Sequence, residues 1–142
     1  MKFFISVFAA LGILALTGCG PRHAAAEPSA AGTNVTEIVH VDPAGAAKLL
    51  ETNHAVVVLD VRTPREFAAG HLKDGVNIDY NASDFRQKLA ELDPNKTYLV
   101  HCAVGGRSTS ALTAFEELGF KKVVHLDGGM KAWEKDGEPV VK

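Results

Sequence analysis

From Glu37 onward, short apolar runs alternate with amphipathic stretches, and this alternation is the feature that most constrains the fold. The run AVVVLDV at 55–61 is rich in β-branched residues, which is typical of a strand buried on both faces of a parallel sheet. The expected strands are residues 38–41, 55–61, 76–78, 97–101 and 123–126. The expected helices are residues 44–51, 64–69, 84–92, 108–118 and 130–135. Strands separated by helices at this spacing predict an α/β fold, a five-stranded mainly parallel sheet with helices on both faces.

Proline, glycine and small polar residues mark the ends of the expected helices. Asp42 followed by Pro43 is the pattern of an N-cap and a first helical residue. Ser83 is the expected N-cap of the third helix. Gly70 and Gly119 are expected to end the helices that precede them, because glycine readily adopts the conformation found just after a helix.

The first eighteen residues have the pattern of a secretory signal peptide, with Lys2, an apolar run at 3–16 and small residues at the end. This run is shorter than the roughly 18–20 apolar residues of a membrane-spanning helix. The sequence Leu-Thr-Gly-Cys at 16–19 also resembles the lipobox of bacterial lipoproteins, whose cysteine is lipidated and becomes the new N-terminus. An ordinary cleaved signal peptide with a chance cysteine nearby is the alternative. We therefore expect Cys19 to carry lipid.

The N-terminal pattern also sets the expected organisation and location. A signal peptide at 1–18 is followed by a lipidated N-terminus and flexible tether at 19–36, and then by one domain at 37–142. Acyl chains on Cys19 would hold the protein on the periplasmic side of a bacterial membrane. Gly20 stands where an Asp would resemble an inner-membrane retention signal, and this favours the outer membrane.

Composition argues against several classes of function. Fifteen Lys and Arg against seventeen Asp and Glu give a formal net charge of -2, so there is no basic excess to neutralise a nucleic-acid backbone. The six histidines show no ligand spacing and the chain has no cysteine pair, so we expect neither a metal site nor a cofactor. With 142 residues the chain has room for one domain, and a tethered monomer is the default expectation.

Cys102 is the residue most open to chemistry. Lipid on Cys19 leaves it as the only thiol, and an unpaired cysteine in an exported protein is a candidate for reactivity. It falls at the end of the fourth expected strand and just before a helix, where ligands bind in parallel sheets. A buried structural thiol is the alternative, and the Gly105-Gly106 pair close behind argues against it.

The segment CAVGGRS at 102–108 is expected to form a cradle for the sulfur. Two glycines let the backbone curl so that several N–H groups face one point. A free cysteine titrates at about 8.5, and lowering that value by about two units takes roughly 2.7 kcal/mol. A helix dipole supplies only about 0.3–1 kcal/mol, so charge-assisted bonds to the loop N–H groups must supply the rest, with help from Arg107. We predict a Cys102 thiolate at neutral pH.

This segment, Cys-x-x-Gly-x-Arg followed by Ser, resembles the active-site loop of rhodanese domains. Three further stretches agree with that family in order and spacing. They are LDVR at 59–62 with Glu66 and Phe67, GHL at 70–72 with VNI at 76–78, and LDGG at 126–129 with Trp133. The resemblance runs from residue 38 to the C-terminus, and it implies the rhodanese α/β fold and a sulfurtransferase activity.

The resemblance implies a two-step covalent mechanism. Cys102 attacks the outer sulfur of thiosulfate or a similar donor, and a second nucleophile such as cyanide or a thiol takes the sulfur from the Cys102 persulfide. By the same resemblance, the residues expected to cradle the persulfide are Ala103, Val104, Gly105, Gly106, Arg107 and Ser108. Arg107 is expected to steady the loop or to meet the anionic donor. Asp60, Arg62 and Glu66 are expected to form a supporting polar network around the site.

Three other side chains have structural rather than catalytic expectations. Strand alternation turns His101 to the opposite side from Cys102, which favours a packed core histidine over a base. His71 is expected to hold a turn, and Trp133 to anchor the last helix in the core.

Two other functions stay open on the sequence. Cysteine-dependent phosphatases carry His-Cys-x-x-x-x-x-Arg, whereas this chain has four residues between cysteine and arginine and places Ser108 where that arginine would stand. A shorter loop suits a single sulfur better than a tetrahedral phosphate. The second alternative is a carrier that brings sulfane sulfur to a protein partner without turning over. Ala103 and Val104 are apolar and Arg107 is the loop's only cation, so the sequence leaves the donor and the acceptor open.

Overall fold

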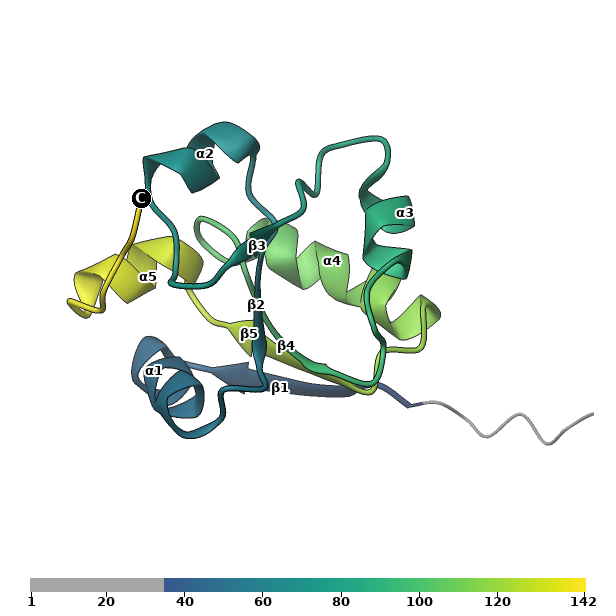
Figure 1. The fold of residues 1–142 in the computed structure, drawn as a ribbon, viewed down its shortest axis with the longest axis horizontal. Helices are drawn as coiled ribbons and strands as arrows, with labels where there is room; N and C mark the ends of the chain where they lie inside the picture. The colour runs from purple at the N-terminus through teal and green to yellow at the C-terminus, as the bar shows by residue number, and fades with distance from the viewer. Residues whose placement is uncertain (1–34) are drawn as a thin grey trace, which may run out of the picture. The chain divides into compact units, whose positions relative to one another are not determined.

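The computed structural model describes residues 35–142, so the predicted signal peptide, Cys19 and most of the tether lie outside the described residues. Strands and helices alternate along the described chain (Figure 1). The strands are β1 (Glu37–Val41), β2 (Val57–Asp60), β3 (Val76–Asn77), β4 (Thr97–His101) and β5 (Lys122–Leu126). The helices are α1 (Pro43–Thr52), α2 (Pro64–Ala69), α3 (Phe85–Ala90), α4 (Gly106–Glu117) and α5 (Gly129–Lys135).

The strands form one five-stranded sheet in the order β1-β5-β4-β2-β3. Each neighbouring pair in this sheet is parallel. An isolated antiparallel bridge joins His71 to Val141 outside the sheet. The carboxyl ends of β4 and β5 therefore lie next to each other at one edge. The predicted fold class, a five-stranded mainly parallel α/β sheet, is confirmed.

Side chains of the central strands alternate between two cores. Val100 of β4 packs on one face among residues of α3 and α4, including Phe85 and Phe115. Leu99, one residue earlier, packs on the other face with residues of α1 and α5, including Trp133. Helices therefore cover both faces of the sheet, as predicted, and Trp133 anchors α5 in the core (Figure 1).

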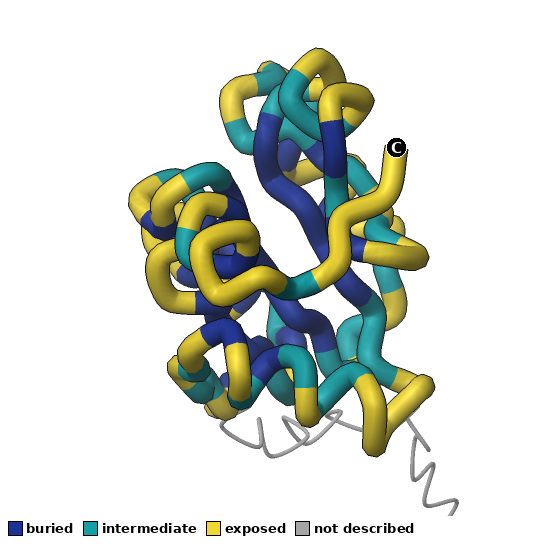
Figure 2. The backbone as a smooth tube through the Cα atoms, turned by 90° about the vertical axis from the view of Figure 1, so that its left-hand side faces the viewer, coloured by how far each residue is buried: buried dark blue, intermediate teal, exposed yellow. Residues whose placement is uncertain are grey.

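Burial follows this arrangement along the chain. Figure 2 shows buried segments running through the middle of the domain and exposed segments at the turns. β4 and β5 are buried over their last four residues, which include His101 and His125. In the part of the chain that the structure describes, no helix has the length and apolar character needed to cross a membrane.

Three predicted helix boundaries are confirmed. The carboxylate of Asp42 accepts a hydrogen bond of 2.8 Å from the N–H of Gly45, and Pro43 is the first residue of α1. Gly70 directly follows α2. Gly119 lies just after α4 with φ of 74°, the left-handed conformation that favours glycine after a helix.

The prediction for the third helix is wrong at both ends. α3 runs from Phe85 to Ala90, and Ser83 is not its N-cap. Asp84 holds the N-cap position without a side-chain capping bond. The N–H of Phe85 donates to the carbonyl of Ala82 in a turn just before the helix. Because this turn leads the backbone into α3, the helix begins without a side-chain cap from Ser83.

The predicted start of the helix after Cys102 is also wrong. α4 begins at Gly106 rather than at Ser108. Gly105 precedes it as the N-cap with φ of 102°, and this left-handed turn brings the chain into the helix directly after the loop. Arg107 and Ser108 therefore belong to the first turn of α4.

Candidate active site

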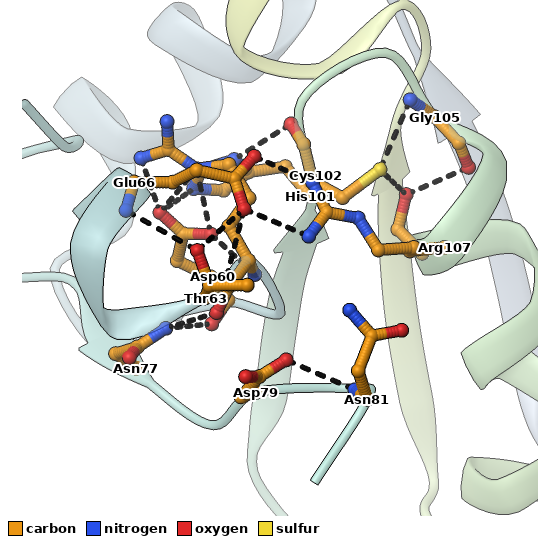
Figure 3. Close-up of polar contacts among 12 residues, drawn as sticks. Asp60, Thr63, Glu66, Asn77, Asp79, Asn81, His101, Cys102, Gly105 and Arg107 are labelled. Atoms are coloured by element: carbon orange, nitrogen blue, oxygen red, sulfur yellow. Dashed lines mark hydrogen bonds and ion pairs between the residues drawn. The ribbon is translucent and has the colours of Figure 1, made fainter.

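Cys102 lies directly after β4, where the chain leaves the sheet and turns toward α4 (Figure 3). We refer to residues 102–105 as the cysteine loop. The Cys102 residue is 1% exposed, and within the part of the chain that the structure describes it is a free cysteine with no disulfide. Val104 in the same loop is 64% exposed, so the loop presents an apolar tip to solvent while the sulfur is shielded. This edge of a parallel sheet is where ligands bind.

Hydrogen-bond donors converge on Sγ of Cys102. The N–H of Gly105 donates to Sγ at 3.1 Å (Figure 3). The hydroxyl oxygen of Ser108 lies 3.5 Å from the same sulfur. The left-handed conformation of Gly105 turns its N–H back toward the sulfur. Because Ser108 is in the first turn of α4, the positive end of that helix also faces the sulfur.

These surroundings shift the pKa of the Cys102 thiol. Burial raises the pKa, because it disfavours the charged thiolate. Hydrogen bonds from the Ser108 hydroxyl and from the backbone N–H groups of Ser108, Val104 and Gly105 lower it. The hydrogen bonds outweigh burial, so the pKa lies below the ordinary value for a cysteine. This direction supports the predicted thiolate.

The start of α5 fixes the cysteine loop through backbone hydrogen bonds. The N–H of Met130 donates to the carbonyl of Cys102 at 2.8 Å. The N–H of Lys131 donates to the carbonyl of Ala103 at 2.9 Å. Gly129 lies so close to the loop that a Cβ atom there would collide with the carbonyl oxygen of Cys102. Because α5 binds these two carbonyls, the loop can turn its N–H groups toward the sulfur.

Arg107 connects the start of α4 to α2 through Glu66. Its guanidinium donates to the Glu66 carboxylate at 2.9 and 2.7 Å (Figure 3). The hydroxyl of Thr63, the N-cap of α2, donates to the same carboxylate at 2.7 Å. The hydrogen bond from Arg107 lowers the pKa of Glu66 to about 2, and the bond to Glu66 raises the pKa of Arg107. The cation predicted to steady the loop or meet an anion is therefore paired with a carboxylate.

Asp60 and Arg62 form a second ion pair, which is buried. Oδ2 of Asp60 lies 2.6 Å from the Arg62 guanidinium, which also donates to the carbonyl of Gly70 at 2.7 Å. The Asn77 amide donates to the backbone carbonyls of Asp60 and Arg62. The three residues predicted to form one network thus lie in two ion pairs, and the Glu66 pair is the one that reaches α4.

His101 lies on the opposite face of the sheet from Cys102, as strand alternation predicts. It is fully buried, and its Nε2 lies 3.8 Å from Oδ2 of Asp60. Burial lowers the pKa of His101, which favours its neutral form. His71 stacks on Phe67 with ring centroids 3.9 Å apart, and its Nδ1 lies 3.1 Å from the Phe67 carbonyl oxygen. His71 therefore holds the turn after α2.

Sequence reasoning missed His125 and Asp127, which lie behind the cysteine loop. Nε2 of His125 is 2.9 Å from the hydroxyl oxygen of Ser108, and Nδ1 is 2.9 Å from Oδ1 of Asp127. His40 of β1 contacts the same carboxylate oxygen at 2.8 Å. The signal that could have found them is topological, because two parallel strands that end side by side bring the residues at and just after their carboxyl ends close together.

His40, His125 and Asp127 are also the one group of metal-ligand types that the described residues bring together. Their candidate ligand atoms lie within 4.8 Å of one another. Hydrogen bonds from the two imidazoles to one carboxylate oxygen account for this closeness. The absence of a metal site stays a prediction of the sequence.

Comparison with known proteins identifies the family to which this chain belongs. Residues 42–136 match the Rhodanese-like domain. The chain is 36% identical over 120 residues to thiosulfate sulfurtransferase 18 of Arabidopsis thaliana, a match that covers 76% of this chain and 87% of that protein. It is 31% identical over 121 residues to the probable adenylyltransferase/sulfurtransferase MoeZ of Mycobacterium tuberculosis. That match covers 85% of this chain and 29% of the relative, so the chain spans less than a third of that protein's length.

A solved structure supports the same assignment. The crystal structure of a rhodanese-related protein from Thermoplasma volcanium matches this fold with a TM-score of 0.64 at 34% sequence identity. The match covers 72% of this chain and 97% of that chain. The chain therefore belongs to the Rhodanese-like domain family, which includes proteins named as sulfurtransferases.

Proposed function

We propose that this chain is a sulfurtransferase that moves sulfane sulfur from thiosulfate or a similar donor to a thiophilic acceptor through a persulfide on Cys102. The observation that carries the proposal is the convergence of the Gly105 N–H and the Ser108 hydroxyl on the buried sulfur. Such donors stabilise negative charge on a thiolate, and on the persulfide that follows, without a cofactor. The name of the Arabidopsis relative supports thiosulfate as the first donor to test.

The reaction balances with the residues at hand. In the first step the Cys102 thiolate attacks the outer sulfur of thiosulfate, a new S–S bond forms to Sγ, and the S–S bond of thiosulfate breaks. Its electron pair leaves with sulfite. In the second step cyanide or a thiolate attacks the outer sulfur of the persulfide, and the electron pair of the S–S bond returns to Sγ. The thiolate is restored, so no external oxidant or reductant is required.

The charges beside the cysteine loop favour sulfur transfer over phosphate hydrolysis. Arg107 donates to Glu66 from two nitrogens, so its positive charge is compensated by a carboxylate. A phosphatase needs its arginine to face a phosphate dianion. Hydrolysis of p-nitrophenyl phosphate that depends on Cys102 would reverse this ranking.

A sulfur carrier for a protein partner is the second candidate, and the exposed apolar side chain of Val104 favours it. An apolar group at the tip of a reactive loop can be covered by a partner surface. Turnover separates the two functions. An enzyme cycles with thiosulfate and cyanide or a small thiol, whereas a carrier loads one sulfur and stalls until its partner is added.

Mass spectrometry of the purified protein tests the central step. The peptide that contains Cys102 is expected to gain one sulfur atom after thiosulfate is added and to lose it after cyanide is added. The Cys102→Ser variant is the control and is expected to gain none. A wild-type protein that takes no sulfur while Cys102 still reacts with an alkylating agent would contradict thiosulfate as the donor.

For location, we propose that Cys19 anchors the protein by lipid to the periplasmic side of a bacterial membrane, with the outer membrane favoured. The support is the sequence of residues 1–20. Replacing Cys19 by Ser is expected to move the protein from the membrane fraction to the soluble fraction. The Cys102→Ser variant, which keeps the N-terminal sequence, is expected to stay with the membrane. Recovery of the wild-type protein only in the soluble fraction would contradict the anchor.

A further inference from the structure

A chain of polar contacts connects the sulfur of Cys102 to the surface through Ser108, His125 and Asp127. The hydroxyl oxygen of Ser108 lies 3.5 Å from Sγ and 2.9 Å from Nε2 of His125. Nδ1 of His125 lies 2.9 Å from Oδ1 of Asp127. Ser108 and His125 are buried, while Asp127 is exposed. The nucleophile therefore has a continuous path through two buried side chains to a carboxylate in contact with water.

The protonation pattern along this path follows from the types of group. An ionised carboxylate can only accept hydrogen bonds, so Nδ1 of His125 donates its proton to Asp127. A neutral imidazole with its proton on Nδ1 has a bare Nε2. This bare nitrogen faces the hydroxyl of Ser108, and the hydroxyl in turn faces the sulfur. The order of groups is that of a nucleophile, a bridging hydroxyl, a base and an orienting carboxylate.

We propose that His125, oriented by Asp127, receives the proton of the Cys102 thiol through the hydroxyl of Ser108. The inference rests on the proposed function, in which Cys102 is the nucleophile. The S–H bond breaks as its proton moves to Oγ of Ser108, and the proton of that hydroxyl moves to Nε2 of His125. The products are a thiolate and an imidazolium. Net charge is unchanged, and the imidazolium is paired with the Asp127 carboxylate.

The same geometry sustains the thiolate once it has formed. An imidazolium donates from Nε2 to Oγ of Ser108, so this nitrogen no longer competes for the hydroxyl proton. That proton can then point to Sγ at 3.5 Å or to the carbonyl of Gly105 at 2.9 Å. His125 and Asp127 are thus positioning residues, because they act on the sulfur through Ser108.

Several other groups face this path and have to be separated from it. His40 of β1 bonds to Oδ1 of Asp127 at 2.8 Å, and its ring centroid is 4.9 Å from that of His125. Thr109 of α4 places its hydroxyl 3.3 Å from Nε2 of His125. Arg107 of α4, which is paired with Glu66, also interacts with the Cys102 thiol. His40 and Thr109 each touch the path without lying between His125 and the sulfur, so their variants serve as matched controls.

The test is the pH dependence of the rate at which iodoacetamide alkylates Cys102, followed on the peptide that contains it. We expect the midpoint to rise by about one pH unit in Ser108→Ala and in His125→Asn, about a tenfold loss of thiolate at neutral pH. Asp127→Asn is expected to shift it in the same direction by less. His40→Gln, Thr109→Val and the exposed His54→Asn are expected to keep the wild-type midpoint.

Coupling between the positions distinguishes a path from general damage to the fold. If His125 acts through Ser108, the double variant Ser108→Ala with His125→Asn shifts the midpoint no further than Ser108→Ala alone. Additive shifts, or a His125→Asn profile that matches the wild type, would overturn the proposal. Persulfide formation from thiosulfate is measured on the same proteins. Wild-type protein that takes no sulfur while the midpoints shift as expected would contradict the proposed transfer from thiosulfate and leave the path standing.

A second measurement keeps His125 in place, and it applies if His125→Asn does not fold. Side-chain nitrogen resonances of His125 are followed by NMR against pH in wild-type protein and in Cys102→Ala. We expect the pH dependence of these resonances to change when the thiol is removed, because the negative charge of the thiolate favours the imidazolium that faces it through Ser108. An identical titration of His125 in both proteins would overturn the proposal.

Discussion

Two glycine-containing turns leave neighbouring strands at the same edge of the sheet, the cysteine loop after β4 and residues 127–129 after β5. Each has a glycine in the left-handed conformation as the N-cap of the next helix, Gly105 with φ of 102° and Gly128 with φ of 73°. Each helix also begins at a glycine, Gly106 in α4 and Gly129 in α5. The local chain path is therefore the same in the two turns, although the contacts they make are different.

The difference lies in where the backbone groups point. The cysteine loop directs the N–H of Gly105 to its own sulfur. The start of α5, which follows the second turn directly, directs the N–H of Met130 to the carbonyl of Cys102 in the cysteine loop. One turn holds the nucleophile, and the other holds the first turn in place. A reactive loop of this kind is thus preorganised by backbone contacts from the next strand as well as by its own sequence.

The largest expected effect comes from adding one methyl group to the second turn. In Gly129→Ala the new Cβ would collide with the carbonyl of Cys102 and lie 3.0 Å from the carbonyl carbon of Ala103, at a left-handed φ of 57°. Backbone strain of about 1–2 kcal/mol and overpacking of about 1–3 kcal/mol together predict a loss of about 3 kcal/mol in the free energy of unfolding. Urea denaturation followed by the fluorescence of Trp133 measures it.

Gly106→Ala is the matched control in the first turn. A Cβ at this position meets nothing within 4 Å, and the residue begins α4. Alanine favours a helix over glycine by about 1 kcal/mol at most, so the free energy of unfolding is expected to stay the same or to rise slightly. Equal losses in Gly129→Ala and Gly106→Ala would show that the two turns do not differ as described.

A smaller loss of stability but a direct effect on reactivity is expected from Gly105→Ala. Its Cβ would lie 3.6 Å from the nearest atom, so no collision occurs, but φ of 102° strains an alanine by about 1–2 kcal/mol. Relaxation of that strain moves the N–H that donates to Sγ, so the pKa of the Cys102 thiol is expected to rise. The alkylation rate of Cys102 at neutral pH measures this. An unchanged rate together with lower stability would mean that this N–H does not control the sulfur.

The fold and the position of the nucleophile could be predicted because both depend on local patterns. The β-branched run around Val57–Asp60 identifies a buried strand, and alternation places Cys102 at a carboxyl end with its side chain opposite that of His101. The start of α4 was not predictable in this way, because it depends on the conformation that Gly105 adopts.

Contacts between distant elements could not be predicted from the same patterns. Arg107 meets Glu66 across 41 positions of sequence, and this contact requires β2 to lie beside β4. His125 meets Ser108 because β5 lies on the other side of β4. The alternation of strands and helices along the sequence does not determine which strands lie beside β4 in the sheet. The order of strands in the sheet therefore determines which polar side chains surround the sulfur.

The smallest expected effect comes from the side-chain contact that holds α4 from α2. Glu66→Gln removes the charge that pairs with Arg107 while keeping the size of the side chain. Both side chains are partly exposed, so the ion pair is expected to contribute about 1 kcal/mol or less. This is well below the loss expected for Gly129→Ala, because solvent screens a side-chain pair but cannot relieve a backbone collision.

The pH dependence of that contribution follows from the pKa of Glu66, which folding lowers from 4.5 to about 2. A carboxyl with a lowered pKa stabilises the folded state fully above its unfolded pKa, and this stabilisation disappears as pH falls through the folded pKa. The difference in free energy of unfolding between the wild type and Glu66→Gln should therefore be constant above about pH 4.5 and shrink toward zero near pH 2. Urea denaturation at several pH values measures it, with Glu134→Gln as a control that removes the same charge from an exposed position on α5. A difference that does not change with pH would assign the contribution of Glu66 to packing. The contact between α2 and α4 would then not depend on the charge of Glu66.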